Sequence, residues 1–262
     1  MGESTLPPGP KSGFLRLLAA IGPGIFIIGY IIGTGSVTSM AKAGAEYGMT
    51  LTWALALSCF CTYVVIVAVS RVTIISGQTL LRCIRQRFGS ALAIFIIAGL
   101  MTTVVASVIG VMGIATDVVR VWSSQVVGGA GFSPLITALV FNGILCFLIW
   151  RGSHGFFLRA MAMIVALMGV SFIATMFLVI PGPVELIQSL KPALPAQSQA
   201  HLVLAAMVGT TMASVCVVTR SYLVAERGWG LEDLKLENRD AIVSLSLTFL
   251  VSAAIMASAA GT

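Results

Sequence analysis

Two short runs of glycine and hydroxyl residues interrupt long apolar stretches of this chain. The run IGTGS at 32–36 lies within an apolar stretch from about 17 to 45, and VGTT at 208–211 lies within one that begins at Leu202. Glycine and threonine both weaken a helix. Lipid offers no replacement hydrogen bonds, so unwound backbone at mid-depth must face protein or a water-filled cavity. Paired interruptions of this kind predict the substrate site of a secondary transporter, with both segments unwound and facing one cavity.

The residue types at the two interruptions suit oxygen-based binding. Freed carbonyls and hydroxyls hold a hydrated hard ion, whereas none of the nine acidic residues falls at either interruption. A dehydrated transition metal would therefore be poorly held, because burying an uncompensated charge is costly. No metal ligand is assigned. The candidate substrate-binding residues are Gly33, Thr34, Gly35, Ser36, Gly209, Thr210, Thr211, Ala213 and Ser214.

Composition places the chain in a lipid bilayer. Hydrophobic residues make up 58% of it and charged residues only 9%, with a mean hydropathy of +1.04, whereas soluble domains are about 25% charged. An apolar segment of about 20 residues spans the hydrocarbon layer. An all-α, multi-pass membrane protein is expected, with seven apolar segments at about 17–45, 51–70, 91–115, 132–150, 156–180, 202–225 and 241–260.

The net charge of +6 is explained by membrane orientation rather than by a nucleic-acid partner. With the N-terminus in the cytoplasm, only Lys42, Arg120 and Lys191 fall outside, which is a strong positive-inside bias. The polar stretch 226–240 is predicted to be a solvated cytoplasmic linker. A cell (inner) membrane location is expected, with the lipid bilayer and the transported species as partners and no obligate protein partner. Twelve basic residues fall inside: Lys11, Arg16, Arg71, Arg82, Arg85, Arg87, Arg151, Arg159, Arg220, Arg227, Lys235 and Arg239.

The order of the segments suggests an incomplete internal repeat. Residues 1–16 form a polar N-terminal tail and 17–262 a transmembrane transporter domain. Five apolar segments begin before the second interrupted one, which is the spacing of a five-helix repeat; inverted repeats place substrate between their interrupted helices. The first repeat would cover about 17–180, and the start of the second about 201–262. We therefore expect a truncated chain that holds only part of a transporter.

Enzymatic motifs are not found in the sequence. It contains no nucleotide-binding loop, no zinc-ligand spacing and no nucleophile elbow. An enzyme is not expected, and no cofactor is expected.

Three further motifs resemble a known transporter family. GPG at 22–24, AGAEYG at 43–48 and SGQTL at 76–80 are similar to the NRAMP family of proton-coupled divalent metal transporters. The resemblance implies the inverted-repeat fold shared with amino acid permeases, with broken helices 1 and 6. It implies secondary-active metal-ion transport as the function.

The resemblance also implies that the family's metal ligands are substituted. Aligned without gaps, residues 33–36 take the places of the family's Asp-Pro-Gly-Asn motif, and only glycine survives. Ala213 takes the place of the metal-binding methionine and Val215 that of a histidine linked to proton movement, while Met212 lies one position away. The substrate is therefore expected to differ from that of the family.

Three functions remain open on the sequence. The first is NRAMP-like ion transport in a modified form. The second is transport of a small organic solute, such as an amino acid or carboxylate, because half-helix N-termini and a Gly-x-Gly turn favour an anionic group. The third is a fragment that transports nothing.

Overall fold

The computed structural model describes residues 34–127, 129–151, 163, 167–172, 174–175, 192–193, 195 and 199–261. Within these residues every regular element is helical, which confirms the all-α class. Gly33 and most of the predicted segment 156–180 lie outside the described residues, so the expected number of seven helices stays a prediction. The helices are α3 (Thr34–Tyr47), α4 (Thr52–Ser76), α5 (Leu80–Phe88), α6 (Ser90–Val127), α7 (Pro134–Arg151), α10 (Ala200–Thr211), α11 (Ser214–Arg227), the 3-10 turn η1 (Leu231–Asp233) and α12 (Leu234–Ala260).

Four helical stretches of the described chain are long and apolar enough to cross a membrane. They are α4, α6, α10 together with α11, and α12 with η1, and α7 contributes a shorter apolar helix at Pro134–Phe147. These stretches cover the second, third, sixth and seventh apolar segments of the sequence. The multi-pass character expected from composition is thereby supported by the helices themselves.

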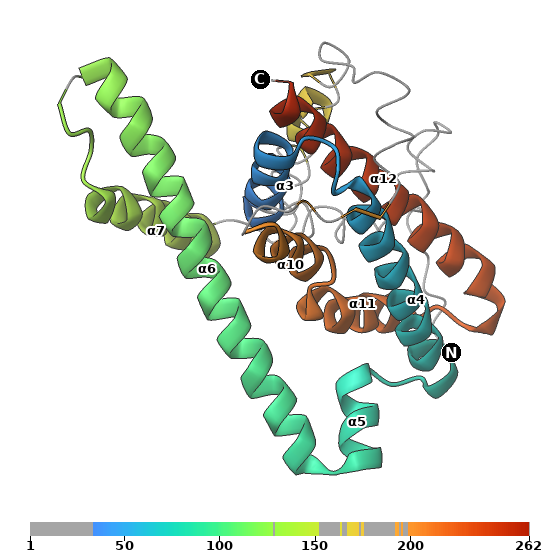
Figure 1. Cartoon of the computed structure of the whole chain (residues 1–262). Coiled ribbons are helices and arrows are strands. Elements are labelled where there is room, and N and C mark those ends of the chain that lie inside the picture. Colours follow the sequence, from blue (N-terminus) through green and yellow to red (C-terminus); the bar gives the residue numbers. More distant parts are fainter. Residues whose placement is uncertain are drawn as a thin grey trace, which may run out of the picture.

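Five helices form one bundle, and α6 and α7 lie to one side of it (Figure 1). The bundle consists of α3, α4, α10, α11 and α12, with α5 connecting α4 to the start of α6. Its main apolar core contains Met40, Leu55, Met207 and Ile255, contributed by four different helices. This core holds α3 and α10 together, and these are the helices that carry the two predicted halves of the substrate site.

Backbone contact between α3 and α12 is unusually close at Gly44. A β-carbon built on this glycine would lie 2.1 Å from the carbonyl oxygen of Met256 and 3.1 Å from the β-carbon of Ala259. Small residues at helix interfaces in membranes allow this approach. Gly44 is therefore required by the position of α3 against α12.

The hydroxyl of Ser221, in the middle of α11, joins the end of α4 to the start of α5. The Leu80 N–H donates to Ser221 Oγ at 2.7 Å, and the same oxygen lies 2.8 Å from Thr73 Oγ1. Gly77 ends α4 at φ +64, where its N–H bonds to the Thr73 carbonyl. Three chain segments therefore meet at Ser221.

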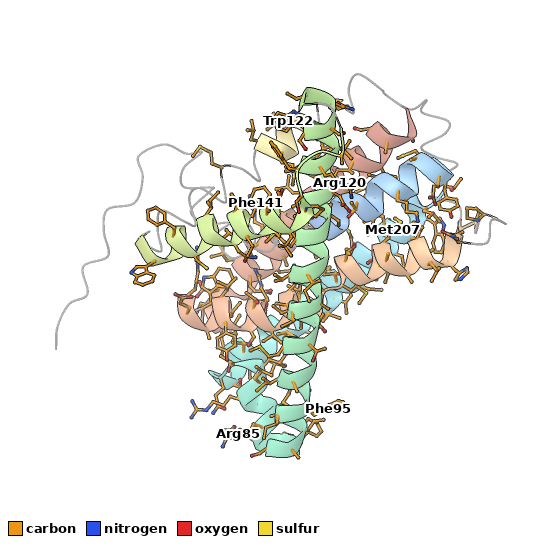
Figure 2. The ribbon with its side chains drawn as sticks, turned by 90° about the vertical axis from the view of Figure 1, so that its left-hand side faces the viewer. Arg85, Phe95, Arg120, Trp122, Phe141 and Met207 are labelled. Atoms are coloured by element: carbon orange, nitrogen blue, oxygen red, sulfur yellow. The ribbon has the colours of Figure 1, made fainter. Side chains whose placement is uncertain are left out.

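Helix α6 exposes apolar side chains along its length. It has 38 residues, so at about 1.5 Å per residue it is much longer than the roughly 30 Å hydrocarbon layer. Figure 2 shows Arg85 and Phe95 near one end of it, and Arg120 and Trp122 near the other. Phe95 is 75% exposed and Trp122 60%. An apolar helix surface of this kind fits contact with lipid.

The prediction of a solvated linker at 226–240 is wrong at its C-terminal end. Glu237 and Asp240 belong to α12 and are 0% and 3% exposed. Arg220, counted above among the basic residues of the inner segments, lies in α11 and is fully buried. These three side chains pair with one another, and mutual neutralisation is what permits charged groups to be buried together.

Candidate substrate site

The two-residue gap between α10 and α11 is the clearest irregularity in a predicted membrane segment. Helix α10 ends at Thr211 and α11 begins at Ser214. Between them, Met212 has φ −92 and ψ 37, and Ala213 has φ −58 and ψ 122. The chain therefore leaves helical geometry at Met212 and re-enters it at Ser214.

The prediction that Gly209–Thr211 are unwound is wrong, because these residues form the last turn of α10. Thr210 Oγ1 donates to the Ala206 carbonyl at 2.9 Å and Thr211 Oγ1 to the Met207 carbonyl at 2.8 Å. Both hydroxyls thus bond to their own helix. The irregular backbone begins after the Gly-Thr run rather than within it.

The first interruption is only partly described. Thr34, Gly35 and Ser36 are the first residues of α3 and are helical, so unwound backbone is wrongly predicted for these three; Gly33 lies outside the described residues. The Gly35 carbonyl accepts a hydrogen bond from Ser39 Oγ at 2.7 Å, and Ser36 is buried. The start of α3 is therefore an ordered helical turn.

The structure brings the two candidate segments together. A β-carbon built on Gly35 would lie 3.6 Å from Thr210 Cγ2, which is van der Waals contact between the start of α3 and the end of α10. Thr62 of α4 also contacts this region, with its Oγ1 3.5 Å from the Thr211 carbonyl oxygen. Gly35, Thr210 and Thr211 thus lie at one junction of α3, α4 and α10. Ala213 and Ser214 follow it directly in the chain.

The gap combines opposite helix ends. The last carbonyls of a helix lack intrahelical partners and carry the negative end of its dipole, and the first N–H groups carry the positive end. The C-terminus of α10 and the N-terminus of α11 are separated only by Met212 and Ala213. Carbonyl and hydroxyl oxygens here could ligate a hard cation, and the first turn of α11 could accept an anionic group.

Sequence reasoning did not include Met212, which the structure places in the gap. Its side chain is 36% exposed, and a thioether is a soft ligand that favours transition metals. The ungapped comparison assigned the ligand position to Ala213, one residue further on. The signal that could have identified Met212 is its residue type next to a Gly-Thr run.

Acidic side chains do not gather at this site. In the described part of the chain, no three His, Cys, Asp or Glu residues lie close enough to hold a metal ion together. A cavity of about 240 Å³ between α3 and α10 is lined by Thr38, Ser39, Lys42 and Gln199 together with apolar side chains. Lys42 and Glu46, one turn apart on α3, form an ion pair with Nζ and Oε1 3.7 Å apart.

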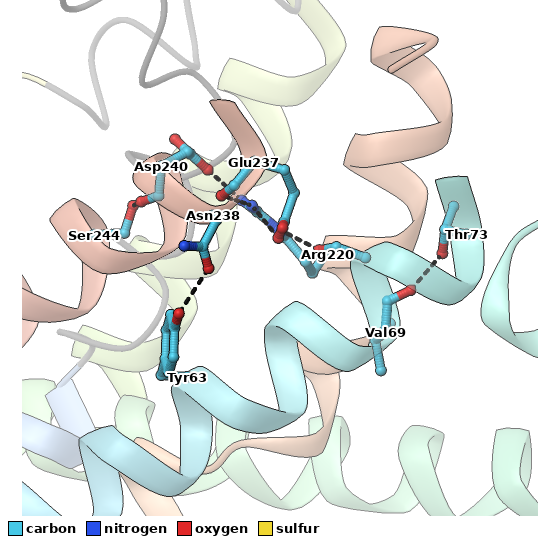
Figure 3. Close-up of polar contacts among 9 residues, drawn as sticks. Tyr63, Val69, Thr73, Arg220, Glu237, Asn238, Asp240 and Ser244 are labelled. Carbon is cyan, nitrogen blue, oxygen red and sulfur yellow. Dashed lines mark hydrogen bonds and ion pairs between the residues drawn. The ribbon is translucent and has the colours of Figure 1, made fainter. Parts of the chain in front are cut away.

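A buried charge cluster beyond the gap was not foreseen from the sequence (Figure 3). Arg220 Nη2 lies 3.2 Å from Glu237 Oε1, and its Nη1 lies 2.5 Å from Asp240 Oδ2. Arg220 Nε donates to Ser70 Oγ at 3.1 Å, and the guanidinium carbon lies 5.7 Å from the ring centroid of Trp229. The signals were an arginine inside an apolar run and two acids three positions apart, which share a helix face.

The described helices are those of a helical, multi-pass membrane protein, and comparison with known proteins identifies the family. A family model for Nramp, natural resistance-associated macrophage protein-like proteins, matches residues 24–262. The chain belongs to this family, as its motifs suggested. Members are integral multi-pass transporters and not enzymes, which confirms the expectation that the chain is not an enzyme.

Individual relatives agree with the family. The chain is 27% identical over 258 residues to the divalent metal cation transporter MntH of Ralstonia nicotianae, with 94% of this chain and 56% of that protein covered. Its fold is similar to the crystal structure of the Eremococcus coleocola manganese transporter bound to an aromatic bis-isothiourea substituted compound. The TM-score is 0.71 at 16% identity, with 97% of this chain and 53% of that chain covered.

A second structure, of a single-residue mutant of the same manganese transporter, gives a TM-score of 0.70 at 16% identity, over 98% of this chain and 55% of that one. The chain spans about half the length of the relatives that it matches.

Proposed function

We propose that this protein takes part in secondary-active transport of a divalent metal ion, with the ion bound at the junction of α3, α4 and α10 beside the Met212–Ala213 gap. The observation that carries the proposal is the contact between Gly35 and Thr210 next to that gap. Membership of the Nramp family and the similarity to MntH support a divalent metal as substrate. The α10–α11 gap would correspond to the break in the sixth helix of the inverted-repeat fold. The first repeat would then cover residues 17–180, and the start of the second repeat would cover 201–262.

The ion should be held chiefly by oxygens. In the ungapped alignment with the family motifs, Gly33, Ser36 and Ala213 take the places of Asp, Asn and Met. The substitution removes one negative charge, which attracts any divalent cation, and one soft ligand, which favours transition metals over hard ions. Met212 offers a thioether one residue away. We infer that the site discriminates less strongly between manganese and harder cations such as calcium.

We therefore predict that the purified protein binds manganese more weakly than a triple variant with the family's ligands restored. The variant is Gly33→Asp, Ser36→Asn and Ala213→Met, which returns a carboxylate, an amide oxygen and a thioether. Isothermal titration with manganese and with calcium measures both affinities. The triple variant should bind manganese at least tenfold more tightly, the equivalent of about 1.4 kcal/mol.

Two controls make the titration decisive. Glu46→Gln changes an acid of α3 that is 42% exposed and paired with Lys42, and it should leave manganese binding unchanged. Micromolar manganese binding that the triple substitution does not alter would place the ion elsewhere. Saturable heat from an amino acid or carboxylate, with none from metals, would favour the organic solute instead.

The orientation of the protein follows from its charges. We propose that the protein lies in the inner membrane of the cell, with its N-terminus and α5 facing the cytoplasm. Arg82, Arg85 and Arg87 of α5 are basic with no acid among the nine residues of that helix, and such clusters stay on the inner side.

Cysteine labelling tests this orientation. A single cysteine at Gln86 should resist an impermeant maleimide added to intact cells, because α5 would be inside. A single cysteine at Ser133, at the other end of α6, should be labelled. Both variants need a background in which the native cysteines are serine, since Cys61, Cys83 and Cys146 are at least partly exposed. Labelling at 86 with protection at 133 would reverse the topology.

A further inference from the structure

Helix α5 connects two of the candidate membrane spans. The span in α4 ends at Ser76, α5 covers Leu80–Phe88, and the span in α6 begins at Ser90. A helix of this length extends over about 14 Å, at roughly 1.5 Å per residue. Both of its ends are joined to a span by short connections, so α5 must lie close to the surface of the bilayer.

The sequence of α5 separates apolar from basic side chains around the helix axis. With about 100° between successive residues, one face carries the apolar side chains Leu80, Leu81, Ile84 and Phe88. Arg85 and Arg87 border this face on its two sides, and Arg82 points away from it. An apolar face bordered by arginines is typical of a helix that lies at a membrane surface.

Four arginines gather in this region without an acid among them. They are Arg71 near the end of α4 and Arg82, Arg85 and Arg87 of α5, and all four are exposed. The acids nearest to them in the sequence are Glu46 and Asp117. Within the described part of the chain, none of the four arginines forms an ion pair. Their charges therefore add up to a positive surface that can attract an anion.

Exposed apolar side chains accompany these arginines. Ile75, Phe88 and Phe95 are 70%, 68% and 75% exposed, and Figure 2 shows Arg85 and Phe95 at the same end of α6. A soluble anion would use the arginines and leave these side chains in water. An anionic phospholipid matches both groups, because arginine binds phosphate well and the acyl chains cover apolar side chains.

We propose that α5 and the end of α4 bind the phosphate headgroups of anionic lipids, and that they anchor this end of the bundle to the bilayer surface. Arg71, Arg82, Arg85 and Arg87 hold the headgroups, and Phe88 enters the layer of acyl chains. Each basic residue near an anionic membrane surface strengthens binding about fivefold. The proposal does not depend on which species the protein transports.

A role in membrane orientation alone would make a different prediction. Basic residues keep a loop on the inner side while the chain is being inserted. Arginines with only this role would leave the folded protein without a preference among headgroups. Lipid binding measured on the purified protein therefore separates the two roles.

Native mass spectrometry provides this measurement. The protein in neutral detergent is titrated with phosphatidylglycerol and, in parallel, with phosphatidylcholine. We expect a preference for phosphatidylglycerol of about tenfold or more, which Arg85→Gln combined with Arg87→Gln should reduce by about fivefold or more. The matched control is Lys235→Gln combined with Arg239→Gln. It removes two exposed basic residues of a stretch that also carries acids, and it should leave the preference unchanged.

Two further variants keep the result interpretable. Arg85→Lys combined with Arg87→Lys retains both charges and should keep most of the preference. Phe88→Ser should weaken the binding of both lipids, and it tests the surface even if the glutamine variant does not fold. Without added lipid, the unfolding midpoints of all folded variants should agree, because the substituted side chains are exposed.

Three outcomes would overturn the proposal. The first is equal affinity of the unmodified protein for the two lipids. The second is a preference that the folded glutamine variant keeps in full, or, if that variant does not fold, lipid binding that Phe88→Ser leaves unchanged. The third is complete displacement of phosphatidylglycerol by inorganic phosphate or by polyglutamate, which would assign the surface to a soluble anion or to an acidic protein.

Discussion

Arg220→Leu is expected to be the most destabilising single substitution in the described chain. It removes the arginine that pairs with both Glu237 and Asp240 and leaves the two carboxyl groups buried. Removing one member of a buried ion pair costs about 3–5 kcal/mol. The midpoint of thermal unfolding, measured on the purified protein in detergent, should fall sharply, and part of the protein should be lost during expression.

Two further variants separate charge burial from lost packing. Arg239→Leu removes an exposed arginine of the same region and should change the stability by no more than about 0.5 kcal/mol. The triple change Arg220→Leu, Glu237→Gln and Asp240→Asn removes every charge of the cluster and should recover much of the loss. If the triple variant were no more stable than Arg220→Leu alone, unpaired charge would not be the cause of the effect.

The membrane helices could be predicted because their signal is local. The apolar segments 51–70, 91–115, 202–225 and 241–260 each reappear in a helical stretch of membrane-spanning length, the third of them as α10 together with α11. The short helix α5 was not among the predicted segments, because its nine residues include three arginines and no apolar run. Its basic residues were still assigned to one side of the membrane from charge alone.

For the candidate site, the sequence indicated which residues to examine but not where the backbone becomes irregular. Gly35 and Thr210 lie in contact, but both belong to helices rather than to unwound backbone, and the irregular residues are Met212 and Ala213. Helix propensity alone does not fix the position of the break. A threonine hydroxyl can bond to a carbonyl of its own helix, so that the helix continues through the residue. Glu237 and Asp240 were predicted to be solvated because a stretch of alternating charges usually lies on the surface. Their burial depends on pairing with Arg220, which is distant from them in the sequence.

Gly44→Ala is the second substitution with a large expected effect. The added methyl group would lie 2.1 Å from the Met256 carbonyl oxygen, which is backbone and cannot rotate away. Helices α3 and α12 must therefore separate, and overpacking of this kind costs about 1–3 kcal/mol or more. Because Gly35 on the same helix touches Thr210, a displaced α3 also widens the proposed site. We expect a lower unfolding midpoint together with weaker binding of the transported ion.

Gly99→Ala provides the matched control. Gly99 lies within α6, and a β-carbon there would meet nothing within 4 Å. Alanine stabilises a helix interior by about 0.5–1 kcal/mol relative to glycine, so this variant should be as stable as the unmodified protein or slightly more so. Equal unfolding midpoints for the Gly44 and Gly99 variants would contradict the close approach of α3 to α12. If Gly44→Ala lowered the midpoint and left ion binding intact, the site would not depend on the position of α3.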